Sequence, residues 1–259
     1  MRCMPSHLKV IDTIHFAMHG VMLRNAENGI HIGDKYVPDE LIVRTSWLLP
    51  ATVVPLSMVI HLLGGNSRDF PFFISEADFP GLERWVFTIG LAISGLIQML
   101  FAYRVWHKYN SRKPTKLLLL FLICGLFVGA NLVIMSFANM YDHLKLHIVT
   151  ASIVFQIGIV WAVLSHFALP GANKPGKKIR ILAIVISIIS YIVMSQAVVR
   201  AVSDLEDYGL QDDTIFTLDR IQYAVDVAAY AEYALFVALI MCLYSIEKDL
   251  SAEAILCEE

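Results

Sequence analysis

The segment YAVDVAAYAEYALFVALIMCLY, residues Tyr223 to Tyr244, decides the fold of this chain. As a helix rising 1.5 Å per residue it is long enough to cross roughly 30 Å of hydrocarbon. An acid near its centre, Glu232, costs about 2.5–3.5 kcal/mol to insert there. Small residues around Glu232 let a neighbouring helix approach closely, so we expect the carboxyl group to face the interior of a helical bundle. These small residues are Ala228, Ala229, Ala231 and Ala234.

The composition of the whole chain also indicates a membrane protein. Its 259 residues are 57% hydrophobic and 17% charged, whereas a soluble domain carries about 25% charged residues. The apolar residues are massed in blocks of membrane-spanning length. We therefore predict an all-α polytopic membrane protein, a six-transmembrane-helix bundle with short loops. The predicted spans are Ser46–Leu63, Trp85–Tyr103, Leu117–Ala138, His147–Leu169, Ile179–Val202 and Ile221–Ile246.

The placement of Lys and Arg predicts the orientation of this bundle. Most of the 20 Lys and Arg residues fall in the N-terminal segment and in the loops after the second and fourth spans, Arg104 and Arg180 among them. The remaining loops carry a surplus of acids. Because cytoplasmic loops are enriched in Lys and Arg, we expect both termini in the cytoplasm.

Three parts follow from this topology. We expect a cytoplasmic N-terminal extension at 1–44, a six-span membrane domain at 45–250 and a short acidic cytoplasmic tail at 251–259. Within the extension, His7–Arg24 places apolar residues on one helical face. This pattern fits an interfacial helix, and it fits a loosely ordered extension equally well.

The loop after the first predicted span is unusually rich in aromatic residues. Phe70, Phe72 and Phe73 lie in it, next to Pro71. Loops are normally polar, so the rings either cap the bundle as a structural lid or cover an entrance for a lipid or substrate. Glu83 lies near the start of the second span, where the helix dipole favours an acid.

His143 and His147, at the opening of the fourth span, are the candidate metal ligands. Their spacing places both imidazoles on one face of a helix. A pair supplies only two ligands and no complete zinc motif is present, so we predict neither a metal nor a cofactor. Hydrogen bonding at the membrane interface or a proton-handling role is the alternative, with His147 the better candidate because it begins the span.

Four other predicted spans each contain one amide side chain. Amide side chains in membrane spans usually form interhelical hydrogen bonds worth about 1 kcal/mol or less each, and we expect the same here. These residues are Gln98, Asn131, Gln156 and Gln196.

In the order of its short motifs, the chain resembles the damage-regulated autophagy modulator (DRAM) superfamily. These motifs are the loop from Phe70 to Ser75 followed by Glu83, the His147 opening of span four, and Ala231-Glu232-Tyr233 in span six. The superfamily also includes Sfk-type plasma-membrane proteins and Golgi proteins that remodel the lipid of GPI anchors. The resemblance implies six spans with cytoplasmic ends, the topology that the charges predict independently.

Some features depart from the pattern of this superfamily. The long N-terminal extension is not part of it, and Pro80-Gly81 stands where a double proline is typical. The lumenal cysteine of some GPI-remodelling members is absent, which weakens the likeness to that subgroup.

The leading hypothesis is a DRAM-like protein of membrane lipid homeostasis, trafficking or autophagy that binds or presents a lipid between its helices. Membrane lipids are the expected partners, a membrane-protein partner is compatible with the sequence, and nucleic acid is not expected. In this hypothesis three phenylalanines guard a lateral opening and the other residues contact the lipid. The candidate lipid-binding residues are Phe70, Phe72, Phe73, His147, Glu232 and Tyr233.

Two alternatives stay open. One is an acyl-transfer enzyme acting on GPI-anchor lipid, with His147 as general base and Glu83 or Glu232 orienting it, although no nucleophile motif accompanies them. The other is a small transporter or proton-coupled channel, which the buried acid and the amides motivate. Repeated halves and broken helices, which are typical of transporters, are not evident. The sequence does not distinguish a Golgi or endolysosomal membrane from the plasma membrane.

Overall fold

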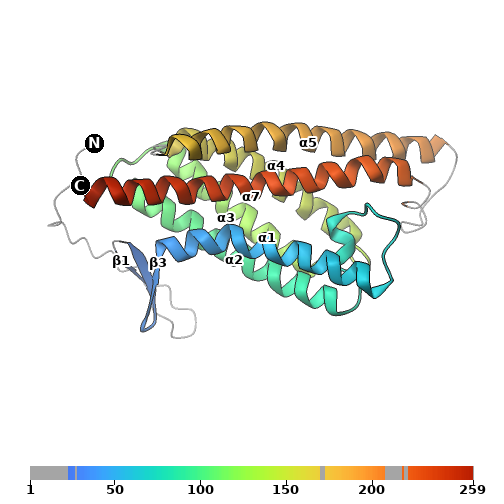
Figure 1. The fold of residues 1–259 in the computed structure, drawn as a ribbon, viewed down its shortest axis with the longest axis horizontal. Coiled ribbons are helices and arrows are strands. Elements are labelled where there is room, and N and C mark those ends of the chain that lie inside the picture. The colour runs from blue at the N-terminus through green and yellow to red at the C-terminus, as the bar shows by residue number, and fades with distance from the viewer. Residues whose placement is uncertain (1–22, 27, 170–172, 208–217, 219–220, 259) are drawn as a thin grey trace.

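The computed structural model describes residues 23–258 apart from 27, 170–172, 208–217, 219 and 220. Six long helices dominate this part of the chain (Figure 1), and each is long and apolar enough to cross a membrane. This agrees with the six predicted spans. The helices are α1 (Asp39–Gly64), α2 (Leu82–Asn110), α3 (Lys116–Phe137), α4 (Leu144–Ala168), α5 (Lys174–Asp207) and α7 (Gln222–Glu258).

Most of these helices extend beyond the predicted spans. α1 begins at Asp39, seven residues before the predicted first span, and its first turn holds Asp39 and Glu40. Acids are favoured there by the helix dipole. α7 continues to Glu258 and so takes in most of the predicted tail. The hydropathy pattern marks the hydrocarbon-spanning part of a helix, whereas polar residues carry the helix on past the membrane boundary.

A small antiparallel sheet precedes α1, and the all-α prediction did not include it. Its three strands pair in the order β1-β2-β3. Gly33, in the turn between β2 and β3, has a φ of 61°, a left-handed conformation that costs glycine little. Leu23 and Arg24 of the predicted interfacial helix belong to β1, and the rest of that segment lies outside the described residues. The strands are β1 (Leu23–Ala26), β2 (Gly29–Ile32) and β3 (Lys35–Pro38).

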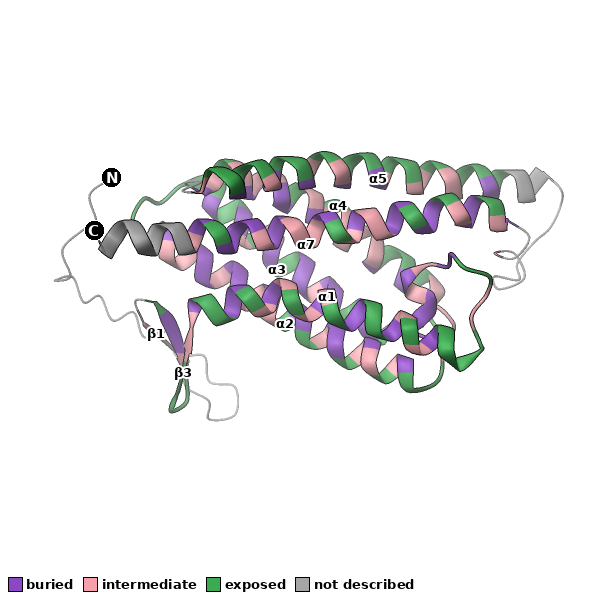
Figure 2. Cartoon of the chain, viewed as in Figure 1, coloured by how far each residue is buried: buried purple, intermediate pink, exposed green. Residues whose placement is uncertain are grey.

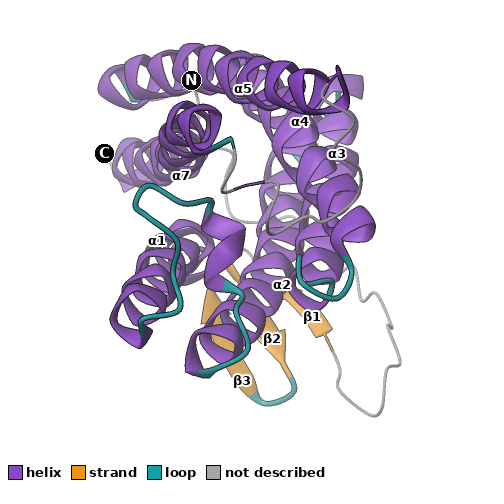
Figure 3. Ribbon diagram, turned by 90° about the vertical axis from the view of Figure 1, so that its right-hand side faces the viewer, coloured by secondary structure: helices purple, strands orange, loops and turns teal. Residues whose placement is uncertain are grey.

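The helices are arranged as a ring (Figure 3). α1 packs on α2, α2 on α3 and α3 on α4, while α5 lies against α4 and α7, and α7 closes the ring against α1. Successive helices run in opposite directions, so α1 begins and α7 ends at the same end of the bundle, next to the sheet. We call this the sheet end. The opposite end, the loop end, carries residues 65–81, which we call the first loop and which contain the short helix η1 (Ile74–Ala77).

Apolar side chains cover the outside of the ring, as a hydrocarbon environment requires. α5 exposes Leu182, Ile189 and Ile192, and Figure 2 shows the exposed face of this helix turned away from the other helices. α2 and α3 meet at two glycines, since a Cβ on Gly95 would lie 2.6 Å from the carbonyl oxygen of Gly129. Only the absence of side chains allows this approach.

Buried ion pairs join the helices at the sheet end. Arg104 of α2 donates to both carboxylate oxygens of Asp39 in α1, at 2.7 and 3.1 Å. The same guanidinium donates to Asn25 at 2.8 Å and to the carbonyl oxygen of Ala26 at 3.0 Å. Arg104 therefore fixes the sheet to the start of α1, and it lies within a helix instead of the loop to which the sequence assigned it.

A second pair, Arg180 and Asp249, joins α5 to α7, with both side chains fully buried. Arg180 also donates to the hydroxyl of Ser245 at 2.9 Å and to the carbonyl oxygen of Ser165 in α4 at 3.2 Å. Asp249 accepts from the backbone N–H of Asn173 at 3.0 Å. One arginine thus holds three helices together.

Candidate functional site

A cavity of about 110 Å³ lies within the ring, and residues of α1, α2, α3, α4, α7 and the first loop line it. On this measure one water molecule needs roughly 10–15 Å³, so the space is large enough for a chain of several carbon atoms. Its walls are almost wholly apolar. His147 near the start of α4 and Ser165 near its end both line it, and at 1.5 Å per residue they lie about 27 Å apart along the helix. The cavity is therefore long and narrow.

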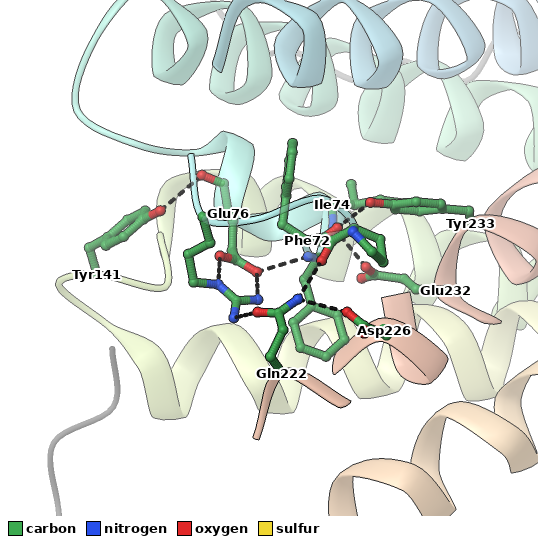
Figure 4. Close-up of polar contacts among 11 residues, drawn as sticks. Phe72, Ile74, Glu76, Tyr141, Gln222, Asp226, Glu232 and Tyr233 are labelled. Carbon is green, nitrogen blue, oxygen red and sulfur yellow. Dashed lines mark hydrogen bonds and ion pairs between the residues drawn. The ribbon is translucent and has the colours of Figure 1, made fainter. Parts of the chain in front are cut away.

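Glu232 lines this cavity and faces inward. The residue is 7% exposed, and its Oε2 accepts a 2.7 Å hydrogen bond from the backbone N–H of Ile74 in the first loop (Figure 4). Among the described residues, no group donates to the other oxygen, Oε1. The unfavourable free energy of placing an acid in this membrane helix is thus offset by a hydrogen bond and by a position away from lipid.

Two neighbouring side chains of α7 hold the same loop. The hydroxyl of Tyr233 donates to the carbonyl oxygen of Phe72, and Nε2 of Gln222 donates to the carbonyl oxygen of Pro71 at 3.2 Å (Figure 4). With the Glu232–Ile74 bond, α7 therefore binds the backbone of the first loop at three successive places.

Arg68 and Glu76 stabilise the loop from within. Arg68 donates to both oxygens of Glu76, at 2.6 and 2.9 Å, and to Oε1 of Gln222 at 2.7 Å. Glu76 also accepts from the backbone N–H of Phe73 at 2.8 Å, at the start of η1. The hydroxyl of Tyr141, after α3, donates to the carbonyl oxygen of Glu76 at 2.9 Å. The first loop is a folded element that contacts helices on both sides.

The three phenylalanines of the loop have different surroundings. Phe70 is 55% exposed, whereas Phe72 is fully buried and Phe73 packs on the cluster of Ile221 and Ala224. The Phe70 ring contacts that of Tyr233, with ring centroids 6.3 Å apart. Of these three rings, Phe70 is the one that faces the surroundings of the bundle.

His147 is buried at 5% exposure and is oriented by the backbone. Its Nδ1 lies 2.8 Å from the carbonyl oxygen of Ala138. Because a carbonyl only accepts hydrogen bonds, Nδ1 carries a proton, and in the neutral ring Nε2 is an acceptor. His147 and Glu232 line one cavity, but within the described residues no hydrogen bond joins them.

Glu83 pairs with a histidine that sequence reasoning missed. Its Oε1 lies 3.4 Å from Nδ1 of His61, and both side chains are buried. The rings of Phe72 and Phe79 pack against the imidazole, with ring centroids 5.3 and 5.6 Å away. Glu83 thus contacts His61 instead of orienting His147. His61 ends α1 and Glu83 begins α2, so adjacent antiparallel helices bring them together.

Other polar groups also line the cavity. Gln98 of α2 is 7% exposed, and its amide, expected to bond to another helix, lies on the cavity wall without a hydrogen-bond partner in the described part of the chain. Ser75 in η1 and Ser165 in α4 line it as well, and so does Trp161, whose Nε1 has no hydrogen-bond partner among the described residues. Gln156, in contrast, donates to the hydroxyl of Tyr191 in α5 as a bridging amide should.

Asp78 lies outside the cavity, in the first loop. It is fully buried, and neither carboxylate oxygen has a hydrogen-bond partner among the described residues. Nε of Arg84 is 3.7 Å from Oδ1. Burial raises the pKa of Asp78 to about 7, although Arg84 and Thr88 favour its charged form.

His143 precedes α4, where its backbone N–H donates to the carbonyl oxygen of Asn139 at 2.9 Å. In the part of the chain that the structure describes, no three His, Cys, Asp or Glu side chains are grouped closely enough to hold a metal ion.

Residues 52–252 match the Frag1/DRAM/Sfk1/Cwh43P N-terminal domain family. The chain belongs to the Frag1/DRAM/Sfk1/Cwh43P family. This confirms the resemblance to the DRAM superfamily and the membrane-spanning class of the protein. No curated protein and no solved structure matches the chain.

The Frag1/DRAM/Sfk1/Cwh43P match includes the first loop and all the residues of α2, α3, α4 and α7 that line the cavity, and it excludes the sheet. Two of the motifs that suggested the family meet in space. In the loop motif, the carbonyl oxygen of Phe72 accepts from Tyr233 of the α7 motif. The backbone N–H of Ile74 donates to Glu232, which precedes Tyr233. The short motifs that the sequence presents separately form one contact at the loop end.

Proposed function

We propose that this member of the Frag1/DRAM/Sfk1/Cwh43P family acts in membrane lipid homeostasis by holding a lipid in the central cavity. The observation that carries the proposal is the long apolar cavity with Glu232 and His147 on its wall. Binding sites for small molecules typically combine an apolar lining with a few polar groups that fix the orientation of the ligand.

The surroundings of the bundle supply the occupant. Apolar cavities stay free of water and accept apolar molecules, and a six-span bundle is surrounded by acyl chains. The cavity extends along most of the roughly 30 Å hydrocarbon thickness. An acyl chain that leaves the bilayer and enters the ring therefore exchanges one apolar environment for another.

We further propose an entrance between the first loop and α7. Phe70 and Tyr230 are both 55% exposed there, and their rings lie edge to face with centroids 6.2 Å apart. The Phe72 ring packs edge to face on that of Phe70, with centroids 6.0 Å apart. Because Glu232 and Tyr233 bind the adjacent backbone, movement of this loop would open the cavity near its polar groups.

The orientation belongs to the same proposal. The distribution of Lys and Arg supports an orientation in which the sheet end lies in the cytoplasm. A role in trafficking or autophagy would depend on which lipid the protein holds. Proteolytic accessibility of a tag at each terminus, in sealed vesicles whose cytoplasmic side faces outward, tests this orientation: both tags should be cleaved, and protection of either one would contradict it.

Native mass spectrometry of the purified chain tests lipid binding. Ala151→Phe places a ring into the cavity, whereas the control Val149→Phe places the same ring on the exposed face of the same helix. We expect the wild type and Val149→Phe to retain a lipid after detergent washing and Ala151→Phe to retain about tenfold less. The proposal fails if Ala151→Phe, shown to be folded by its circular dichroism, keeps the lipid at the wild-type level.

Acyl transfer is the second candidate, and Ser75 favours it. Ser75 lines the same cavity as His147, and its hydroxyl would supply the nucleophile for which the sequence shows no motif. In such a reaction Nε2 of His147 removes the Ser75 proton as Oγ attacks an ester carbonyl, and the leaving alcohol takes that proton. Water or a second alcohol then accepts the acyl group and restores Ser75.

Lipid analysis of GPI anchors separates the two candidates. Cells in which Ser75→Ala replaces the wild type should show a changed acyl composition only if transfer occurs. The conservative Ser75→Ala change leaves the backbone bonds of the loop in place, so lipid retention by the purified variant serves as the control. An unchanged acyl composition excludes this second candidate.

A further inference from the structure

The charges of the cavity wall restrict its ligand. Among the residues that the structure describes, the lining includes one carboxyl group, that of Glu232, and no Lys or Arg side chain. A phosphate head would therefore lose its water without gaining a counter-charge, which is costly in an apolar site. An ionised Glu232 would add repulsion, and a neutral one would provide no compensation.

His147 requires a hydrogen-bond donor from the ligand. Its Nδ1 is used by the carbonyl oxygen of Ala138 at 2.8 Å, which leaves Nε2 as an acceptor in the neutral ring. Within the described residues no side chain or backbone group donates to Nε2. A buried acceptor without a partner is unfavourable, so a ligand that donates here gains a bond that the protein does not make for itself.

Glu232 accepts a hydroxyl group in either of its protonation forms. Oε2 is used by the backbone N–H of Ile74 at 2.7 Å, and Oε1 remains available. An ionised Oε1 accepts from a hydroxyl group, whereas a protonated one donates to it. A hydroxyl group both donates and accepts, so it fits Glu232 without a change in the site.

From these groups, and building on the proposed lipid binding, we infer that the ligand is an uncharged lipid with a hydroxyl head, bound to Glu232 and His147. A diacylglycerol, a ceramide-type lipid and a long-chain alcohol share this chemistry. The apolar remainder of the ligand lies along the narrow part of the cavity. We expect a phospholipid to bind less well, because the described lining residues offer its phosphate no cation, and an ether or ester without a free hydroxyl group leaves Nε2 of His147 unpaired.

A set of probes with one chain and different heads tests the inference. The full-length chain, washed free of lipid, is offered equal amounts of palmityl alcohol, its methyl ether, palmitic acid and palmitoyl lysophosphatidic acid. Native mass spectrometry then measures the occupancy of each. We expect the alcohol to bind about tenfold more tightly than the ether, since one hydrogen bond is lost, and the phosphate to be the weakest ligand.

Substitution of Glu232 locates the head. Glu232→Gln keeps an acceptor for Ile74 and a donor for the ligand, so the preference for alcohol over ether should persist. Glu232→Leu should reduce alcohol binding about tenfold. Asp226→Leu is the matched control, because Asp226 lies in the same helix, accepts from Gln222 at 2.7 Å and does not line the cavity.

The outcomes separate this inference from the proposed function. If no probe occupies the wild-type chain, lipid binding itself is refuted. If the probes bind but the ether equals the alcohol, or the phosphate exceeds it, only the hydroxyl head is refuted. Equal alcohol binding by Glu232→Leu and Asp226→Leu would likewise refute the position of the head while leaving the cavity as a lipid site.

Discussion

The two ends of the bundle treat buried charge differently. At the sheet end, the guanidinium of Arg104 makes four hydrogen bonds, to Asp39, Asn25 and Ala26, and Arg180 of α5 is bonded to α4 and α7. At the loop end, Arg68 and Glu76 form a bonded pair too, but both carboxylate oxygens of the buried Asp78 lack hydrogen-bond partners among the described residues. Glu232 and His147 each have one hydrogen bond there, to the backbone of Ile74 and of Ala138. The ends are therefore suited to different tasks.

A buried polar group with all its bonds made stabilises one structure, whereas one with bonds unmade is a candidate for ligand binding or conformational change. By this criterion the sheet end holds the helices in register. Unpartnered ring N–H or N atoms do occur toward the sheet end, in Trp106 and His166, but the unpartnered carboxylate oxygens, those of Asp78, lie at the loop end, where the first loop meets α7 and the cavity wall. Most of the candidate lipid-binding residues lie there.

The largest effect that this comparison predicts is for Asp249→Asn at the sheet end. The change leaves the guanidinium of Arg180 fully buried without a counter-charge, and breaking such a pair costs about 3–5 kcal/mol. Glu83→Gln at the loop end leaves a hydrogen bond to His61 available and should cost only about 1 kcal/mol. Denaturation of both variants in the same detergent measures the difference.

A double variant distinguishes an ion pair from a packing defect at this position. Arg180→Met combined with Asp249→Leu removes both charges, so much of the stability lost in Asp249→Asn should return. If Glu83→Gln instead proves as damaging as Asp249→Asn, the loop end depends on its His61–Glu83 contact as strongly as the sheet end depends on Arg180–Asp249, and the contrast between them is wrong.

The second prediction concerns Asp78 and pH. Its pKa of about 7 in the folded chain lies above the ordinary 3.8, so between these values the folded state keeps a proton that the unfolded state has lost. Stability should consequently fall as the pH rises from about 4 to about 7. The substituted side chain in Asp78→Asn cannot ionise, so this variant should not be destabilised as the pH rises. The destabilisation that it avoids is at most about 4 kcal/mol.

Thermal unfolding at about pH 5 and about pH 8 checks this sign. The advantage of Asp78→Asn over the wild type should be larger at the higher pH. Asp142→Asn is the control, because Asp142 lies 3.5 Å from Nη1 of the same Arg84 but its side chain is 60% exposed. Equal pH dependence of the wild type and Asp78→Asn would show that Asp78 is not the group that titrates.

The sequence predicts the fold of this protein better than it predicts the contacts of the candidate site. The six spans were predictable because a membrane helix must satisfy its backbone internally and present apolar side chains over a fixed thickness. The sheet at residues 23–38 was not, since its strands are four residues long and half exposed. Arg104 and Arg180 were assigned to loops because a charge count does not reveal a partner in another helix.

For the site, composition indicated the inward position of Glu232, because an acid among alanines has few other acceptable environments in lipid. Its partner, the backbone N–H of Ile74, was not predictable, because every residue but proline has such a group. The His61–Glu83 pair depends on which helices are adjacent. Gln98 was expected to form a hydrogen bond between helices, and only the three-dimensional arrangement of the helices shows that its amide lies on the cavity wall.

The smallest predicted effect is that of Tyr233→Phe, which removes the hydroxyl group that donates to the carbonyl oxygen of Phe72. One hydrogen bond contributes about 0.5–1.5 kcal/mol, so global stability should change little. The loop should nevertheless open more often, because one of the three hydrogen bonds that join its backbone to α7 is gone. Faster hydrogen exchange of the Ile74 amide, which Glu232 otherwise protects, would report this opening.

Exchange at the sheet end should stay as in the wild type, since the contacts of Arg104 and Arg180 are untouched. If exchange instead accelerates equally at both ends, the first loop does not move independently of the bundle, and the proposed entrance beside α7 loses its support.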